Sequence, residues 1–99
     1  MAAVRKPLDQ ETAELIAERF RTLGDPTRLL ILDHLRRYGE TAVGEIAAAV
    51  GSSQQNTSKH LSILRVERIA SRRKQGTSTL YRVADPSVYP LCDGALGAG

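Results

Sequence analysis

The sequence predicts one mainly α-helical domain of about five helices with a small β-hairpin near its end. Three observations support this fold class. Apolar residues recur at helical spacing over most of the chain, residues that cap or end helices separate these stretches, and the spacing alternates after Ile69. The 99 residues, 41% of them hydrophobic, fit a single domain over residues 1–99.

The first expected helix runs from Leu8 to Leu23. Ile16 and Phe20 lie between these leucines at helical spacing, so one face of the helix is apolar. Asp9 is expected to cap its start, because a carboxylate accepts hydrogen bonds from the free backbone N–H groups there.

The second expected helix starts at Asp25 and Pro26 and extends to about Tyr38. Aspartate caps free N–H groups, and proline suits the first helical position. Five apolar residues leave this helix little polar surface, which predicts a central place in the core: Leu29, Leu30, Ile31, Leu32 and Leu35.

A short third helix is expected over Ala42 to Val50, with Thr41 as its cap. Gly51 is expected to end it in the left-handed conformation that glycine adopts without strain. Its apolar stripe consists of Val43, Ile46, Ala47 and Val50.

The fourth helix is expected from Gln54 to about Glu67, capped by Ser52 and Ser53. One side is predicted to be buried and contains Thr57, Leu61 and Leu64. The opposite side is polar and contains Gln55, Ser58, Lys59, Ser62 and Arg65.

The hairpin consists of two alternating segments, Ala70 to Gln75 and Ser78 to Val83. They flank Gly76-Thr77, a pair typical of a tight turn. A short final helix is expected to start near Asp85-Pro86.

Positive charge is concentrated in one third of the chain. Residues 1–51 contain seven Lys and Arg against eight Asp and Glu, residues 52–83 contain seven against one, and the remainder adds two acids. The net charges are therefore −1, +6 and −2, which sum to the overall +3. Such a basic block is expected of a nucleic-acid surface, although a solvated basic face has the same composition.

The third and fourth helices, with a tight turn between them and a basic hairpin after them, predict a winged helix-turn-helix. The fourth helix would enter the major groove of double-stranded DNA, where its first side chains contact base edges. Gln and Asn pair with adenine, and Lys reaches guanine or phosphate. The candidate recognition residues are Gln54, Gln55, Asn56, Ser58, Lys59 and His60.

The hairpin, as the wing, contains three adjacent cations. They repel one another unless an anion binds, and the phosphate backbone of DNA is the expected anion. The candidate wing residues are Arg72, Arg73, Lys74, Gln75 and Thr77.

Three regions of the chain resemble the ArsR/SmtB-type winged-helix repressors of bacteria and archaea. They are Phe20 to Leu32, Ser58 to Leu64, and Arg73 to Gly76 with Tyr81 to Val83. The resemblance covers nearly the whole chain. It implies a homodimer that packs through the first and last helices. It also implies a repressor that occupies an operator and releases it when an inducer binds.

The metal sites of that family are not expected here. Members that sense arsenite, cadmium or lead have Cys-x-Cys at the start of the third helix, where this chain has Ala42-Val43-Gly44. Members that bind zinc, cobalt or nickel place an acid and a histidine at the start of the last helix, where this chain has Asp85 and Ser87. One carboxylate does not replace four ligands, so no metal and no cofactor are predicted, and the inducer stays open.

Neither the histidines nor the cysteine suggest another chemistry. His34 is interpreted as a surface or core-edge residue, and Cys92 as a small buried apolar residue, with a disulfide across a dimer as the alternative. No nucleophile stands at a recognisable spacing from a base, so the chain is not expected to be an enzyme. Two other functions stay open, a protein-binding winged helix without DNA contact and a regulator that acts with a second subunit.

The expected location is the cytoplasm. No apolar run reaches the roughly 18 residues that a membrane span needs, so no membrane partner is expected. A single cysteine forms no disulfide within the chain, which suits a reducing compartment.

Overall fold

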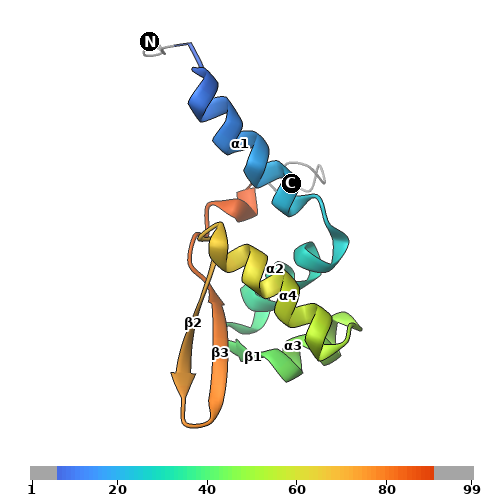
Figure 1. Cartoon of the computed structure of the whole chain (residues 1–99). Coiled ribbons are helices and arrows are strands. Elements are labelled where there is room, and N and C mark those ends of the chain that lie inside the picture. The colour runs from blue at the N-terminus through green and yellow to red at the C-terminus, as the bar shows by residue number, and fades with distance from the viewer. Residues whose placement is uncertain (1–6, 91–99) are drawn as a thin grey trace.

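The computed structural model describes residues 7–90, in which helices pack against a three-stranded antiparallel sheet (Figure 1). The elements in chain order are α1 (Gln10–Leu23), α2 (Pro26–Tyr38), β1 (Thr41–Ala42), α3 (Val43–Val50), α4 (Gln54–Val66), β2 (Ala70–Gln75) and β3 (Ser78–Val83). The predicted fold class is confirmed, and both hairpin strands have the predicted bounds. No helix within residues 7–90 is long and apolar enough to cross a membrane.

Local hydrogen bonds start three of the helices at the capping residues expected from the sequence. The side chains of Asp9, Asp25 and Ser53 each accept a hydrogen bond from the backbone N–H three residues on, at 2.7, 3.1 and 3.0 Å. Gly51 ends α3 with φ of 70° and ψ of 35°, the left-handed conformation that was predicted. The helix boundaries therefore follow mainly from interactions between near neighbours in sequence.

The third strand, β1, was not predicted. Thr41 pairs with Tyr81 and Ala42 with Leu80, which places β1 beside β3 in the order β1-β3-β2. The prediction that Thr41 caps the third helix is wrong, because its Oγ1 donates to the Gly39 carbonyl at 2.7 Å and α3 begins after Ala42 without a side-chain cap. Two residues have no periodicity of their own, so only their pairing with β3 defines this strand.

The hydrophobic core lies between α2, α3, α4 and the sheet. Its fully buried side chains include Ile31, Leu32, Ile46, Leu61, Leu64, Ile69 and Val88. The predicted inner faces of α3 and α4 are confirmed. The prediction for α2 is wrong at Leu29 and Leu30, which are 38% and 51% exposed.

The first helix, α1, projects from the rest of the molecule (Figure 1). It begins at Gln10, and of its predicted apolar stripe only Leu23 is buried. Ile16 and Phe20 are 42% and 53% exposed. An apolar helix face thus has no partner among the described residues of this chain.

The end of the described chain turns back onto α2. A helical turn starts at Val88, later than the predicted start near Asp85, and the Asp85 carboxylate accepts hydrogen bonds from the Ser87 N–H and hydroxyl. The Tyr89 hydroxyl donates to a carbonyl of α2 at 2.9 Å. The remainder of the predicted final helix, with Cys92, lies outside the described residues.

Candidate nucleic-acid interface

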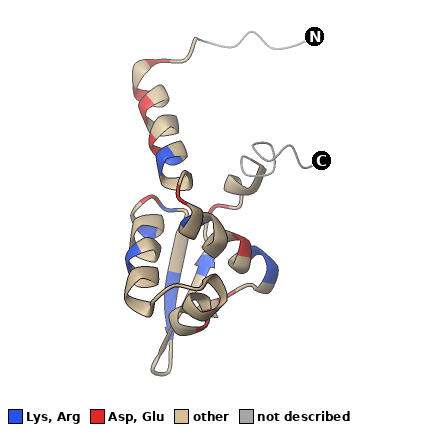
Figure 2. Ribbon diagram, turned by 90° about the vertical axis from the view of Figure 1, so that its right-hand side faces the viewer, with Lys and Arg blue, Asp and Glu red and all other residues tan. Residues whose placement is uncertain are grey.

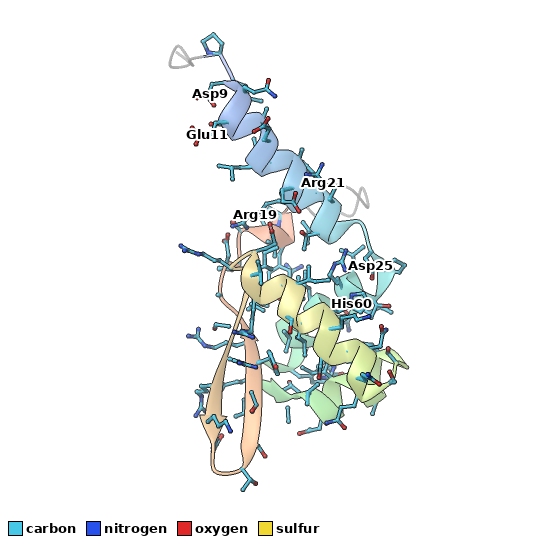
Figure 3. All side chains as sticks on the ribbon, viewed as in Figure 1. Asp9, Glu11, Arg19, Arg21, Asp25 and His60 are labelled. Carbon is cyan, nitrogen blue, oxygen red and sulfur yellow. The ribbon has the colours of Figure 1, made fainter. Side chains whose placement is uncertain are left out.

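The turn after α3 presents the first two turns of α4 on the surface of the molecule (Figure 3). Gln54, Gln55, Asn56 and Lys59 are exposed, and Ser58 is half-buried. The opposite face of the helix is inserted into the core. The first half of α4 therefore offers amide, hydroxyl and ammonium groups to a ligand outside the domain.

These polar side chains differ in whether they already have a hydrogen-bond partner within the protein. The Asn56 amide donates to the Ser52 hydroxyl at 2.9 Å, across the start of the helix. Gln55, Ser58 and Lys59 make no side-chain hydrogen bond within residues 7–90. Their donors and acceptors remain available for an external partner.

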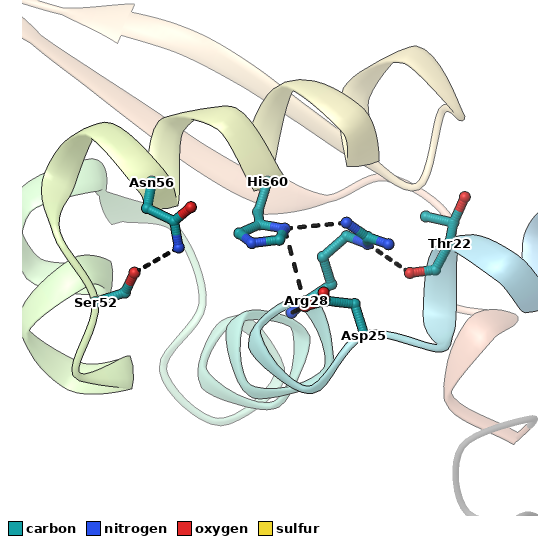
Figure 4. Close-up of polar contacts among 6 residues, drawn as sticks. All are labelled: Thr22, Asp25, Arg28, Ser52, Asn56 and His60. Atoms are coloured by element: carbon teal, nitrogen blue, oxygen red, sulfur yellow. Dashed lines mark hydrogen bonds and ion pairs between the residues drawn. The ribbon is translucent and has the colours of Figure 1, made fainter.

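His60 points toward α2 and not away from the domain (Figure 4). Its side chain is 14% exposed, and its Nδ1 accepts a hydrogen bond from the Arg28 guanidinium at 3.0 Å, because a guanidinium only donates. Arg28 also donates to the Thr22 carbonyl at 2.6 Å, and the Asp25 carboxylate lies 3.9 Å from the same His60 nitrogen. This network connects the middle of α4 to the junction of α1 and α2.

The surroundings of Asp25 favour its ionised form. Burial by itself raises the pKa of this carboxyl, but the hydrogen bond from the Arg28 backbone N–H and the charge of Arg28 bring the pKa below its ordinary value. A carboxylate at this position also complements the positive end of the α2 dipole. Asp25 therefore stays ionised at neutral pH, where it caps α2.

The wing divides its three cations between two faces of the hairpin. Cross-strand partners share a face, and Arg72 is opposite the buried Tyr81. Because side chains alternate along a strand, Lys74 lies on the face of Arg72 and Arg73 on the other. There the Arg73 guanidinium donates two hydrogen bonds to the Glu40 carboxylate, at 2.7 and 2.8 Å.

The Arg73–Glu40 pair neutralises one of the wing cations. The hydrogen bond from Arg73 is the main reason why the pKa of the Glu40 carboxyl is lowered, with further contributions from the charges of Arg73 and Arg82. The remaining candidate wing residues, Gln75 and Thr77, are exposed at the tip of the hairpin. Lys74 makes no ion pair within residues 7–90, so its charge is available for an anion.

Charge is distributed unevenly over the molecule. Figure 2 shows basic residues on α4 and on the hairpin strands, and acidic residues along α1. The latter are Glu11, Glu14 and Glu18. An anionic ligand is thus attracted to α4 and the wing and repelled from α1.

Within residues 7–90, no group of three or more His, Cys, Asp and Glu side chains is placed to hold a metal ion. Asp85 instead pairs with Arg19 at 2.7 Å, and hydrogen bonds from the Ser87 hydroxyl and then Arg19 lower its pKa. The His34 ring packs against the Tyr38 ring with centroids 4.7 Å apart. Asp85 and His34 are therefore already in contact with other protein groups.

Two residues of this region were missed in the sequence analysis. Arg28 lies in a segment on which the family resemblance depends, so the resemblance contained a signal for it. Glu40 had no such signal, because its partner Arg73 is 33 residues away in the chain.

Comparison with known proteins gives matches over most of the chain. Residues 25–72 match the family described as bacterial regulatory protein, arsR family. The uncharacterized HTH-type transcriptional regulator MJ1325 of Methanocaldococcus jannaschii is 40% identical over 81 residues, which cover 82% of this chain and 91% of that protein.

Two solved structures are similar to the whole fold. The AntR antimony-specific transcriptional repressor has a TM-score of 0.83 and 33% identity, and the match covers 93% of this chain and 83% of that one. The homodimeric winged helix-turn-helix DNA-binding domain of Mb0332 from Mycobacterium bovis has a TM-score of 0.75 and 30% identity, covering 94% and 87%. The winged helix predicted from the sequence is thereby confirmed.

Proposed function

This chain belongs to the arsR family of bacterial regulatory proteins, and we propose that it represses transcription as a homodimer that binds an operator through α4 and the wing. As a member of that family it is a DNA-binding transcription regulator and not an enzyme. The observation that supports the proposed binding mode best is the free polar face at the start of α4. Gln55, Ser58 and Lys59 have no partner within residues 7–90 and lie opposite the buried face of the helix.

In the proposed complex α4 lies in the major groove. An α-helix fits this groove, and the Gln55 amide has the donor and acceptor that pair with the N6 and N7 edge of adenine. Lys59 would bind guanine or a phosphate, and Lys74 of the wing a backbone phosphate. His60 would support the position of α4 through Arg28.

The proposed dimer forms through α1 together with the end of the chain. The exposed apolar face of α1 includes Leu15, Ile16 and Phe20, and a second copy of this helix would remove it from water. The similar domain of Mb0332 is homodimeric. Residues 1–99 then form a single DNA-binding domain with its dimerisation elements at the two ends.

We propose that the operator is released by an inducer other than the metals that cysteine thiolates bind. Ala42 and Gly44 stand where metal-sensing members have cysteines. A protein-binding module without DNA contact is not favoured, because similar proteins such as AntR are transcriptional repressors.

Replacing Gln55 by Ala should weaken binding to an operator, selected from a random duplex pool, by about 1 to 3 kcal/mol, since one bidentate base contact is lost. Binding to a scrambled duplex should change little. Fluorescence anisotropy at constant salt measures both affinities. Gln10→Ala, an exposed glutamine at the start of α1, serves as control, and equal discrimination by Gln55→Ala and the unmodified protein would exclude Gln55 from base recognition.

Replacing Lys74 by Gln should lower the slope of log affinity against log salt by about 0.9, because one phosphate contact is lost. The operator and a random duplex should be affected alike, since a phosphate contact carries no sequence information. Arg73→Gln removes the same charge from the other face, where Glu40 already binds it, and is expected to leave the slope nearly unchanged. Equal slopes for all three proteins would place Lys74 away from the DNA backbone.

A further inference from the structure

A shallow, open basic cleft of about 490 Å³ lies where α4 ends and β2 begins. Its lining consists of Arg65, Arg68, Ala70, Ser71, Arg72 and Ala84. Three of these six residues are arginines and none is acidic. The two acids next to lining residues in sequence, Glu67 and Asp85, are not part of the lining. The charge of Glu67 acts on Arg21 of α1, and Asp85 pairs with Arg19.

The three arginines of the cleft differ from most other arginines of the described chain. The guanidinium groups of Arg65, Arg68 and Arg72 make no hydrogen bond or ion pair with any group within residues 7–90. Arginines elsewhere are held by a carboxylate, a carbonyl or an aromatic ring, namely Arg19, Arg21, Arg28, Arg36, Arg37 and Arg73. Three unpaired guanidinium groups around one cleft repel one another, and an anion between them would remove the repulsion.

The backbone at the end of α4 places Arg68 at the cleft. Its φ of 61° is the left-handed conformation that commonly ends a helix, and here the Arg68 N–H donates to the Arg65 carbonyl and the Ile69 N–H to the Leu64 carbonyl, both at 2.9 Å. The chain turns from α4 into β2 at this residue, so Arg65 and Arg72 reach the same cleft.

We propose that this cleft binds a phosphate-type oxyanion, with Arg65, Arg68 and Arg72 as its cationic ligands. A planar guanidinium offers paired N–H groups to two oxygens of one anion. The anion is either a backbone phosphate of bound DNA or a free phosphate compound. The first source rests on the proposed function, and the second does not.

The first arm of the test needs no DNA. The full chain is titrated with inorganic phosphate at constant ionic strength while the amide NMR signals of Ala70 and Ser71 are followed, and saturable shifts are expected. Arg68→Gly keeps a residue that adopts the left-handed conformation readily, and Arg72→Gln changes an exposed position, so both variants should fold. Each should weaken phosphate binding by about tenfold, as expected when a hydrogen bond to a charged group is lost, whereas Arg37→Gln on α2 should not.

The second arm measures the salt dependence of binding to a random duplex. A slope that falls by about 0.9 in Arg68→Gly, but not in Arg37→Gln, identifies the anion as a backbone phosphate, whether or not free phosphate binds. Saturable phosphate binding with an unchanged slope identifies a free phosphate compound. No saturable shift together with an unchanged slope would overturn the proposal. A protein that binds no duplex at all would refute the proposed function and leave the first arm to decide on the cleft.

Discussion

Replacing Phe20 by Asp should convert the regulator into a monomer and lower its operator affinity by about 10² to 10⁴, the range over which linked binding exceeds single-site binding. Phe20 is 53% exposed on α1, within the apolar face proposed to meet a second copy. A carboxylate buried in an apolar interface without a partner is strongly unfavourable. Sedimentation equilibrium measures the mass, and fluorescence anisotropy measures the affinity.

The matched control is Tyr38→Asp, the same kind of change at an exposed aromatic residue. Tyr38 is 71% exposed. It is the last residue of α2, at the end of that helix that lies away from α1 in sequence. This variant should remain a dimer with nearly unchanged affinity. A dimeric Phe20→Asp protein would show that α1 is not the interface, and a monomer with undiminished affinity would show that DNA binding needs one copy only.

Replacing Leu61 by Ala should lower the free energy of unfolding by about 2 to 5 kcal/mol, the range for deletion of a buried leucine side chain. Leu61 is fully buried on the inner face of α4, where it packs in the core shared with α2 and α3. The loss is a large part of the roughly 5 to 15 kcal/mol that stabilises a typical domain. Urea unfolding followed by circular dichroism, at a fixed protein concentration, measures the change.

Ser62→Ala is the comparison on the same helix. Ser62 is exposed, so its replacement should change the free energy of unfolding by no more than about 0.5 kcal/mol. A similarly small effect of Leu61→Ala would mean that the core repacks around the cavity, and that α4 depends less on this leucine than its burial suggests.

Much of the local structure could be predicted because its causes are local. Asp25 and Ser53 bind N–H groups three residues away, and Gly51 ends α3 through its own backbone conformation. The two hairpin strands are joined by a two-residue turn, so their register follows from Gly76-Thr77. The exposed polar residues at the start of α4 could be selected by the same means, since their exposure follows from the helical period.

Contacts between distant residues could not be predicted in this way. β1 exists only because Thr41 meets Tyr81, forty residues on, and Arg73 differs from Arg72 only because Glu40 lies on its side of the sheet. The amphipathic pattern of α1 predicted burial, yet most of its apolar face finds no partner in the described chain. Periodicity indicates that a face is apolar and does not indicate what covers it.

The sequence by itself determined the helices, the hairpin, the basic third of the chain and the polar, exposed face of α4, because these depend on near neighbours and on composition. Only the tertiary structure decided which charged side chains are free. It paired Arg73 with Glu40 and His60 with Arg28, and it left Arg65, Arg68 and Arg72 around one cleft. The reason is that the availability of a charge depends on the groups within a few ångströms of it, and folding selects those groups from anywhere in the chain.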